Sequence, residues 1–380
     1  MIRLTIPFIE DEDLRAVQEA LASGYLVQGH RVAAFEKQVA QRAGTDFAVA
    51  VSNCTAALHL SLLALEVQAG DLIIVTAYSW VATANVIEVC GAHPIFVDIQ
   101  PDTFNMDPSV LESVLKRLMS NRETARRVKA ILPVHAFGLM ASMSEIMELA
   151  DRYQIPVVED AACALGAELN ERPAGSWGKL GCFSFHPRKA ITTGEGGMIV
   201  GRDGELIRRL QALRNHGQDP HSQSPDFILP GLNCRMTEFQ AALGITQMKK
   251  LEHIIESRIS LARCYEQLLR ETSLTLPAVP SGHAPVFQSY VVLLPEEDPG
   301  FRDPIIARLK EKGVETTIGT WNLPMTRFFR TRYGFEPGDF PVADSVFARS
   351  LTLPLYAHMT RSDQETVAEE LKILLIERQR

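Results

Sequence analysis

Hydrophobic and polar residues follow two alternating periods along the chain. Short apolar runs at 47–51 and 72–75 have the length of strands that are buried on both faces. The segments between such runs are longer and carry apolar residues at helical spacing, as Leu14, Val17 and Leu21 do. This alternation predicts an α/β protein with a mostly parallel sheet that helices cover on both faces.

The same criteria predict further elements in the first 255 residues. Strands are expected at 94–99, 128–134, 157–158, 182–185 and 198–200. Helices are expected at 11–23, 31–42, 56–65, 108–119 and 203–213. Residues 217–232 are rich in Ser, Pro and Gly and lack periodicity, which predicts a long loop of the kind that is typically functional or disordered.

A long helix links this part to the rest of the chain. From residue 236 onward one helical stripe carries large apolar residues, namely Met248, Leu251, Ile255 and Ile259. We place the boundary at residue 255, so that 1–255 form a large domain and 256–380 a smaller α+β domain. In the smaller domain we expect strands at 286–294 and 314–318, and helices at 303–312 and from residue 362, where Thr360 and Asp363 have capping spacing.

Composition and charge narrow the range of functions. Of the 380 residues, 46% are hydrophobic and 22% are charged, which is typical of a globular protein. The net charge of −8 gives no support to binding of nucleic acid or of an anionic membrane surface. The N-terminus lacks a secretion signal and no apolar run could span a bilayer, so we expect a cytoplasmic protein.

The cysteines give no indication of a metal site or of disulfides. None belongs to a CxxC pair or has a histidine at metal-ligand spacing, so we expect neither zinc nor a disulfide framework. The six cysteines stand at positions 54, 90, 163, 182, 234 and 264.

Two polar residues stand where predicted strands end or meet. Asp160 follows the apolar Val157 and Val158, at the carboxyl end of a predicted parallel strand, where open α/β sheets bind ligands. Lys189 lies between two predicted strands, so apolar surroundings are expected to lower its pKa and free its amine as a nucleophile. A pyridoxal phosphate (PLP) enzyme needs both groups, because lysine holds the aldehyde as a Schiff base and aspartate keeps the pyridine nitrogen protonated. From these residues alone, a surface lysine and a helix-capping carboxylate fit equally well.

Two turns carry candidate cofactor contacts. Residues 52–55 precede an apolar helix, whose first N–H groups can cradle a phosphate, although a plain N-cap is the commoner use of such residues. Trp80 lies in a turn before another helix, where its ring can stack on a cofactor or pack in the core. Neither turn on its own decides between these alternatives.

Longer motifs favour the cofactor site. The runs EDAACALGAEL (159–169), FSFHPRK (183–189) and TTGEGG (192–197) resemble the motifs of the DegT/DnrJ/StrS sugar aminotransferases, a group of fold-type I PLP-dependent enzymes. The resemblance continues in four further segments, SNCTAALHL (52–60), GAHPIFVDI (91–99), RNHG (214–217) and GLNCRMTEFQAALG (231–244). It implies the fold-type I architecture, with a large PLP-binding domain and a small C-terminal domain.

The resemblance also implies roles for individual residues. Lys189 is expected to carry the Schiff base and Asp160 to face the pyridine nitrogen. The phosphate is expected to be held by Cys54, Thr55, Ser184 and, across a homodimer interface, Asn233 of the partner subunit. The active sites are then shared between two subunits.

Two further residues are expected beside the cofactor ring. Trp80 matches the aromatic residue that the family places against the ring. Cys163 stands where the family often has glutamine or histidine to bond the phenolate oxygen, and cysteine is a weaker donor. A second departure is Gly319, Thr320 and Trp321, where many relatives have a His-Tyr pair near the substrate.

The implied function is transfer of an amino group from glutamate or glutamine to a keto-sugar that is linked to a nucleotide. A keto-cyclitol or a free sugar is an alternative acceptor. A PLP-binding sensory or regulatory protein without turnover is a further alternative. The related sugar dehydratases have histidine in place of the Schiff-base lysine, so Lys189 argues against them.

Overall fold

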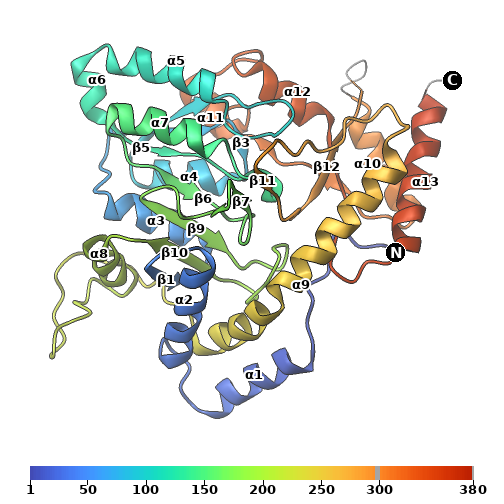
Figure 1. The fold of residues 1–380 in the computed structure, drawn as a ribbon. Coiled ribbons are helices and arrows are strands. Elements are labelled where there is room, and N and C mark those ends of the chain that lie inside the picture. The colour runs from blue at the N-terminus through green and yellow to red at the C-terminus, as the bar shows by residue number, and fades with distance from the viewer. Residues whose placement is uncertain (296–299, 379–380) are drawn as a thin grey trace.

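The computed structural model describes residues 1–295 and 300–378. Figure 1 shows a layered α/β body and, beside it, a second group of helices and strands that the long helix α9 (Glu238–Leu269) reaches. Within the described residues, no helix is both long and apolar enough to cross a membrane. The body contains the mostly parallel sheet that the sequence predicts.

That sheet has the strand order β4-β2-β5-β6-β9-β10-β1. Parallel bridges from Ile131 to Val157 and from Val134 to Asp160 join β5 to β6. All neighbouring strands are parallel except that β10 runs antiparallel to both β9 and β1. The strand bounds are β1 Phe47–Val51, β2 Leu72–Thr76, β4 His93–Val97, β5 Val128–Leu132, β6 Val158–Asp160, β9 Leu180–Ser184 and β10 Gly197–Gly201.

Helices cover both faces because alternate residues of each strand belong to different apolar clusters. Ala48 and Ala50 of β1 pack in one cluster, and Val49 and Val51 pack in the other. The helices of this part are α1 Asp11–Ala22, α2 His30–Arg42, α3 Cys54–Ala64, α4 Ala82–Val89, α5 Pro108–Met119, α6 Arg122–Arg127, α7 Met143–Tyr153 and α8 Gly204–Arg214.

The strands and helices expected in the first 255 residues are present, with ends shifted by a few residues. The sequence prediction omitted α7, although Met143, Ile146 and Leu149 have helical spacing and are buried. It also missed the short pieces η1 (Ala136–Gly138), β7 (Glu168–Leu169) and β8 (Arg172–Pro173). Pieces of two or three residues leave no periodicity to detect.

The second group of elements contains the antiparallel sheet β12-β15-β13. Its strands are β12 Tyr290–Leu293, β13 Thr317–Ile318 and β15 Ser350–Leu353, and the helices of this group are α10 Arg302–Glu311 and α13 Arg361–Arg378. Helices α11 (Arg327–Tyr333) and α12 (Pro341–Arg349) pack instead in an apolar cluster of the α/β body. The start of the chain joins the second group, because Ile2 bridges Val314 and the carbonyl of Leu4 accepts the N–H of Leu355. Figure 1 accordingly shows the N-terminus beside α13.

Strand β12 is shorter than the predicted strand at 286–294. The N–H groups of Val286 and Ser289 donate to the carbonyls of Gly138 and Phe137 in η1. Residues 286–289 are therefore bound to the α/β body and are not part of the strand. The next residues form β12. Helix α9 runs through residue 255 without a break, and a boundary there remains a prediction.

Two small strand pairs connect the parts of the chain. Strand β11 (His283–Ala284) pairs with β7, and β14 (Trp321–Asn322) pairs with β3 (Tyr78–Ser79), which follows β2 directly. In each of these two pairs, the two strands lie far apart in the sequence. The sequence prediction had a turn at Tyr78 to Trp80, and the structure has a short strand there.

Helix α1 is attached to α9 through a buried carboxylate. Asp13, which is 1% exposed, accepts hydrogen bonds from Thr246 Oγ1 (2.5 Å) and Gln247 Nε2 (3.1 Å) and forms an ion pair with Lys250. Burial acts to raise the pKa of Asp13, but Lys250 and the Thr246 hydroxyl outweigh it and hold the pKa below its usual value.

We therefore expect acid to weaken this attachment. Because the pKa of Asp13 is lower in the folded chain, its contribution to the free energy of unfolding is full above the unfolded-state pKa of about 3.9 and is lost as pH falls through the folded-state pKa. Asp13→Asn removes the buried charge partner of Lys250 and should lower the free energy of unfolding at neutral pH by about 3 kcal/mol. Denaturant unfolding at a series of pH values measures both effects.

The matched control is Glu12→Gln. Glu12 pairs with Lys249, and both side chains are about half exposed, so its loss should change the free energy of unfolding by less than about 0.5 kcal/mol. If Asp13→Asn keeps the stability and the acid sensitivity of the wild type, Asp13 does not anchor α1.

Candidate functional site

Asp160 ends β6 and is buried, with 4% of its surface exposed. Its Oδ2 accepts a hydrogen bond from Thr83 Oγ1 at 2.7 Å, and its Oδ1 accepts the N–H of Ala162 at 3.2 Å. Because the Thr83 proton is used in this way, Ser79 Oγ donates to Thr83 Oγ1 at 2.9 Å. Burial raises the pKa of Asp160, and the Thr83 hydrogen bond opposes this rise.

Thr83 is a site residue that the sequence prediction missed. It lies in the first turn of α4, just after the turn that contains Trp80. The residues next to Thr83 in the sequence are uncharged and form no motif, and the hydrogen bond from Thr83 to Asp160 joins residues 77 positions apart. No local pattern in the sequence could have indicated it.

Lys189 lies in the loop between β9 and β10, as predicted. Its Nζ donates to Cys163 Sγ at 3.1 Å. The loop is held from several sides, because Lys189 N–H donates to the carbonyl of His186 and Gln288 Nε2 donates to the carbonyl of Arg188 at 2.8 Å. The lysine side chain is thereby directed at the end of β6.

The predicted fall in the pKa of Lys189 is wrong for this arrangement. Burial alone lowers the pKa of Lys189, which is the effect that the sequence led us to expect. The hydrogen bond and the charge interaction with Cys163, together with attraction to Cys54 and Asp160, outweigh burial and raise the pKa. The free lysine is therefore held as an ammonium ion.

Cys54 is the first residue of α3 and interacts electrostatically with Asp160 and Lys189. Burial raises the pKa of the Cys54 thiol well above its usual value, so the thiol stays protonated, which fits a small neutral side chain and not a nucleophile. The N-cap of α3 is Asn53, whose Oδ1 accepts the N–H of Ala56 at 2.8 Å. The N–H groups of Cys54 and Thr55 belong to the first turn, where the helix supplies no acceptor.

Strand β10 approaches this helix start closely. A Cβ atom at Gly197 would lie 2.5 Å from the backbone carbon of Asn53 and 2.7 Å from the nitrogen of Cys54. Only glycine fits there, which gives the GG of the TTGEGG motif a physical reason. Ser184, at the end of β9, pairs with Gly197 in the sheet register and is 9% exposed.

Two predicted site residues lie at the surface of the single chain. Trp80 is 62% exposed, directly after β3. Asn233 is also exposed, and its neighbour Cys234 accepts the N–H of Ser52 at the start of the α3 turn. The structure thus brings together Asp160, Lys189, Cys163 and Cys54, with Ser184 one strand away, and leaves Trp80 and Asn233 facing solvent.

Glu159, next to Asp160, faces the opposite side of β6. Its carboxylate accepts the N–H groups of Gly175, Trp177 and Gly178 at 2.7–2.8 Å. It also bonds His135 Nε2 at 2.9 Å, while His135 Nδ1 accepts the N–H of Ala141, which makes His135 a neutral donor to Glu159. His135 is therefore a structural residue.

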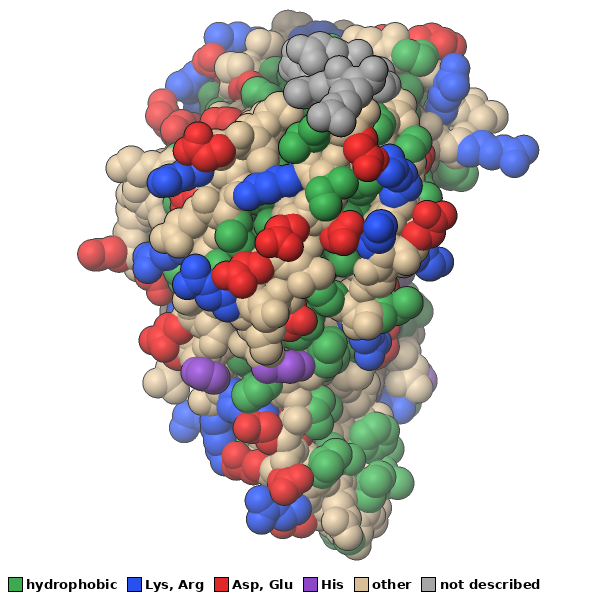
Figure 2. Space-filling view, turned by 90° about the vertical axis from the view of Figure 1, so that its right-hand side faces the viewer, with side chains coloured by type: hydrophobic (Ala, Val, Ile, Leu, Met, Phe, Trp, Pro, Cys, Tyr) green, Lys and Arg blue, Asp and Glu red, His purple; other side chains and the backbone are tan. Residues whose placement is uncertain are grey.

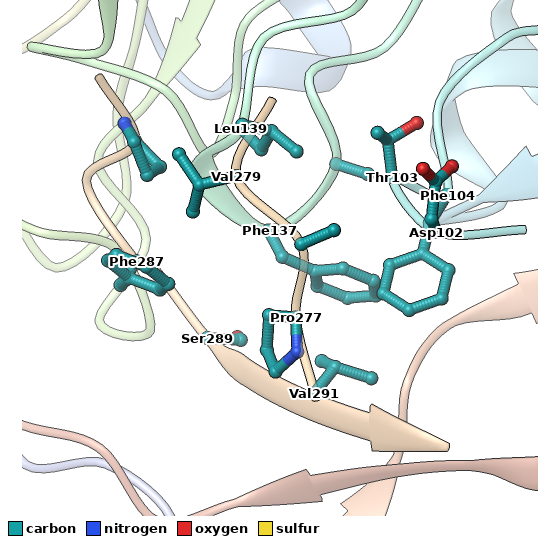
Figure 3. A pocket seen from close by; sticks show the side chains of 13 residues that line it. Asp102, Thr103, Phe104, Phe137, Leu139, Pro277, Val279, Phe287, Ser289 and Val291 are labelled. Carbon is teal, nitrogen blue, oxygen red and sulfur yellow. The ribbon is translucent and has the colours of Figure 1, made fainter. Parts of the chain in front are cut away.

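A small cavity lies apart from these residues. Figure 3 shows it between η1 and the segment around Pro277 and Val279, with Phe104 and Phe137 at its wall. Its volume of ≈ 30 Å³ suits one or two water molecules, since one water needs roughly 10–15 Å³. It is too small for a metabolite. Within the described residues, no cluster of three or more His, Cys, Asp or Glu side chains could hold a metal ion.

The sheet order, the lysine loop and the carboxylate at the end of β6 define the fold-type I class of aminotransferases. Residues 7–372 match the DegT/DnrJ/EryC1/StrS aminotransferase family, and the chain belongs to that family. The predicted family and fold are thus confirmed.

Individual relatives are similar over almost their whole length. The chain is 34% identical over 382 residues to the uncharacterized protein MJ1066 of Methanocaldococcus jannaschii, covering 98% of this chain and 97% of that one. The structure of the aminotransferase TlmJ from Streptoalloteichus hindustanus is 31% identical, with a TM-score of 0.91 and full coverage of both chains. The PMP form of the putative sugar aminotransferase Spr1654 from Streptococcus pneumoniae is 26% identical, with a TM-score of 0.92 over 99% of this chain and 100% of that chain.

Proposed function

We propose that this protein is a PLP-dependent aminotransferase that moves an amino group from glutamate or glutamine to a nucleotide-linked keto-sugar. The observation that carries the proposal is the meeting of Lys189, Asp160 and the start of α3 in one site. Spr1654, which has been solved in PLP and PMP forms, is described as a putative sugar aminotransferase and has the same fold.

The residues of the site fit the cofactor chemically. Lys189 would supply its amino group to the aldehyde after its ammonium form loses a proton, and Asp160 would supply a buried carboxylate for the pyridine nitrogen. The first N–H groups of α3, at Cys54 and Thr55, and the hydroxyl of Ser184 are suited to the phosphate. Bound PLP supplies the electron sink that a transamination needs.

The side chains of this chain do the remaining work. Asp160 is held toward the site by Thr83, and its carboxylate would stabilise a positive charge on the ring nitrogen. Lys189 moves the proton at the reacting carbon, and Cys163, its hydrogen-bond partner, orients its Nζ.

A homodimer with shared sites belongs to the proposal. Exposed apolar side chains gather on α1 and the segment after it, and Figure 2 shows hydrophobic side chains at the lower end of the molecule, where α1 lies. The first set comprises Leu14, Leu21, Tyr25, Leu26 and Val27. A second set precedes Asn233 in the chain and comprises Phe227, Ile228 and Leu232. Such patches mark protein interfaces, which supports the proposal that Asn233, itself exposed, enters the site of a partner subunit.

The other candidates have less support. A sugar dehydratase of the related group would need histidine where Lys189 stands. A sensory protein that binds PLP would use the same lysine to hold the aldehyde, so turnover with a keto-sugar distinguishes the two functions. The free cysteines suit a reducing compartment, and we place the protein in the cytoplasm.

The first prediction concerns Lys189. The purified protein should be yellow, and reduction with borohydride should attach the cofactor to Lys189, which peptide mass spectrometry detects. Lys189→Ala should lose this attachment. If the alanine variant keeps the same reducible chromophore, Lys189 is not the residue that binds the aldehyde.

The second prediction concerns the dimer. Lys189→Ala and Asn233→Ala each inactivate a different half of a shared site, so mixing the two variants under conditions of subunit exchange should restore up to about a quarter of the wild-type sites. Each variant mixed with itself is the control. A fully active monomer in sedimentation experiments would exclude shared sites.

The third prediction concerns the acceptor. After a single turnover with glutamate, the aminated enzyme should return to its yellow form fastest with nucleotide-linked keto-hexoses. Free keto-sugars, keto-cyclitols and α-keto acids are tested in parallel at equal concentration. If the yellow form returns with keto-cyclitols alone, or with α-keto acids other than the product of the donor, the acceptor is not a nucleotide-linked keto-sugar.

A further inference from the structure

One threonine supplies the only side-chain hydrogen bond that the described part of the chain offers to the Asp160 carboxylate. Thr83 Oγ1 donates to Asp160 Oδ2 at 2.7 Å, and the other oxygen accepts the backbone N–H of Ala162 at 3.2 Å. Thr83 is 1% exposed, and its own N–H donates to the carbonyl of Trp80 at 3.1 Å. The threonine hydroxyl is therefore held in place beside Asp160.

The direction of this hydrogen bond is set by Ser79. Ser79 is 5% exposed, its Oγ lies 2.9 Å from Thr83 Oγ1, and within the described residues its hydroxyl bonds no other group. If Ser79 donates to Thr83 and Thr83 donates to Asp160, both hydroxyl protons have acceptors. In the opposite direction, a protonated Asp160 donates to Thr83 and Thr83 to Ser79, which leaves the buried Ser79 proton without an acceptor. The two hydroxyls therefore favour the carboxylate form of Asp160.

This preference counteracts the burial of Asp160. Burial raises the pKa of Asp160, and the Thr83 hydrogen bond is the largest of the effects that lower it again. Other titratable groups interact with Asp160 through their charges alone, namely Lys189 in the loop between β9 and β10, His135 after β5, Cys54 at the start of α3 and Cys182 in β9. Without the Thr83 hydroxyl, the carboxylate would lose its main support against burial.

The position of Ser79 is fixed from the C-terminal part of the chain. Ser79 ends β3, and Trp321 of β14 lies opposite it in the antiparallel register. The preceding Tyr78 is fully buried, and its hydroxyl bonds Ser350 Oγ at 2.9 Å and accepts the N–H of Thr320 at 3.0 Å. The two hydroxyls thus have their positions in the free chain, and no ordering cost remains for a later step.

We propose that Thr83, with Ser79 behind it, is a positioning residue that keeps Asp160 ionised and directed at the pyridine nitrogen of PLP, and thereby sets the affinity for the cofactor. The inference rests on the proposed function and assigns a role within it to two residues that act through Asp160. An ionised carboxylate beside the ring nitrogen favours the protonated form of that nitrogen, whereas a neutral carboxyl group does not.

The experiment compares Thr83→Val and Thr83→Ser with the wild type. Valine has the shape of threonine without the hydroxyl, and serine keeps the hydroxyl. PLP is removed from each purified protein and titrated back, and calorimetry measures its affinity. We expect the valine variant to bind PLP about 10- to 100-fold more weakly and the serine variant to stay within about threefold of the wild type, because only valine removes a hydrogen bond to a charged group.

A second readout reports the charge on the ring itself. NMR of PLP labelled with nitrogen-15 in the ring measures the pH at which the pyridine nitrogen loses its proton. This pH should be lower in the valine variant than in the wild type, because a neutral Asp160 does not stabilise the protonated ring. Ser79→Ala should shift it in the same direction by less, since Thr83 can still donate to Asp160.

The matched control is Thr76→Val. Thr76 ends β2 and is 1% exposed, and its hydroxyl has no hydrogen-bond partner among the described residues. This variant should match the wild type in both measurements. Circular dichroism checks that each variant is folded, and Thr83→Ala removes the same hydroxyl without the bulk of valine should the valine variant not fold.

The outcomes separate this inference from the proposed function. Wild-type affinity in Thr83→Val, or weaker affinity with an unchanged titration of the ring nitrogen, overturns the role of Thr83 and leaves the proposed function intact. Equal weakening in the serine and valine variants also overturns it, because the hydroxyl is then not the cause. A wild type that does not bind PLP overturns both, whereas a wild type that binds PLP but aminates no keto-sugar overturns the proposed function alone.

Discussion

Two adjacent buried carboxylates at the end of β6 are the constraint on which the site depends. Because successive residues of a strand face opposite sides, Glu159 and Asp160 point in opposite directions. Glu159 accepts the N–H groups of Gly175, Trp177 and Gly178, which lead into β9, and β9 in turn leads to the loop of Lys189. Asp160 faces that lysine from the other side. Strand β6 thus positions the lysine loop through Glu159 and supplies the negative partner of Lys189 through Asp160.

The charge balance of the site is compatible with the cofactor that we propose for it. Asp160 is buried with a raised pKa, and Lys189 has a raised pKa because thiol and carboxylate neighbours outweigh burial. Burial disfavours the charged form of a carboxylate, and a positively charged ring nitrogen beside it would stabilise that form. Burial also raises the pKa values of the Cys54 and Cys182 thiols.

The C-terminal part of the chain contributes to the site through one strand pair. Strand β14 attaches to β3, and β3 precedes the helix that carries Thr83. Trp321 lies opposite Ser79, which is linked by hydrogen bonds through Thr83 to Asp160. The neighbouring Tyr78 bonds Ser350 through its hydroxyl.

The sequence by itself determined the elements of the large sheet, the end of β6 at Asp160, the lysine between β9 and β10, and the family. Each depends on local periodicity or on motifs of a few consecutive residues. Only the tertiary structure decided the protonation of Lys189, the link from Thr83 to Asp160 and the place of Trp321. Lys189 meets a thiol 26 residues away and Tyr78 meets Thr320 across 242 residues. Local patterns predicted that Lys189 would be buried, but they contained nothing about the charges and partners that folding brings to it.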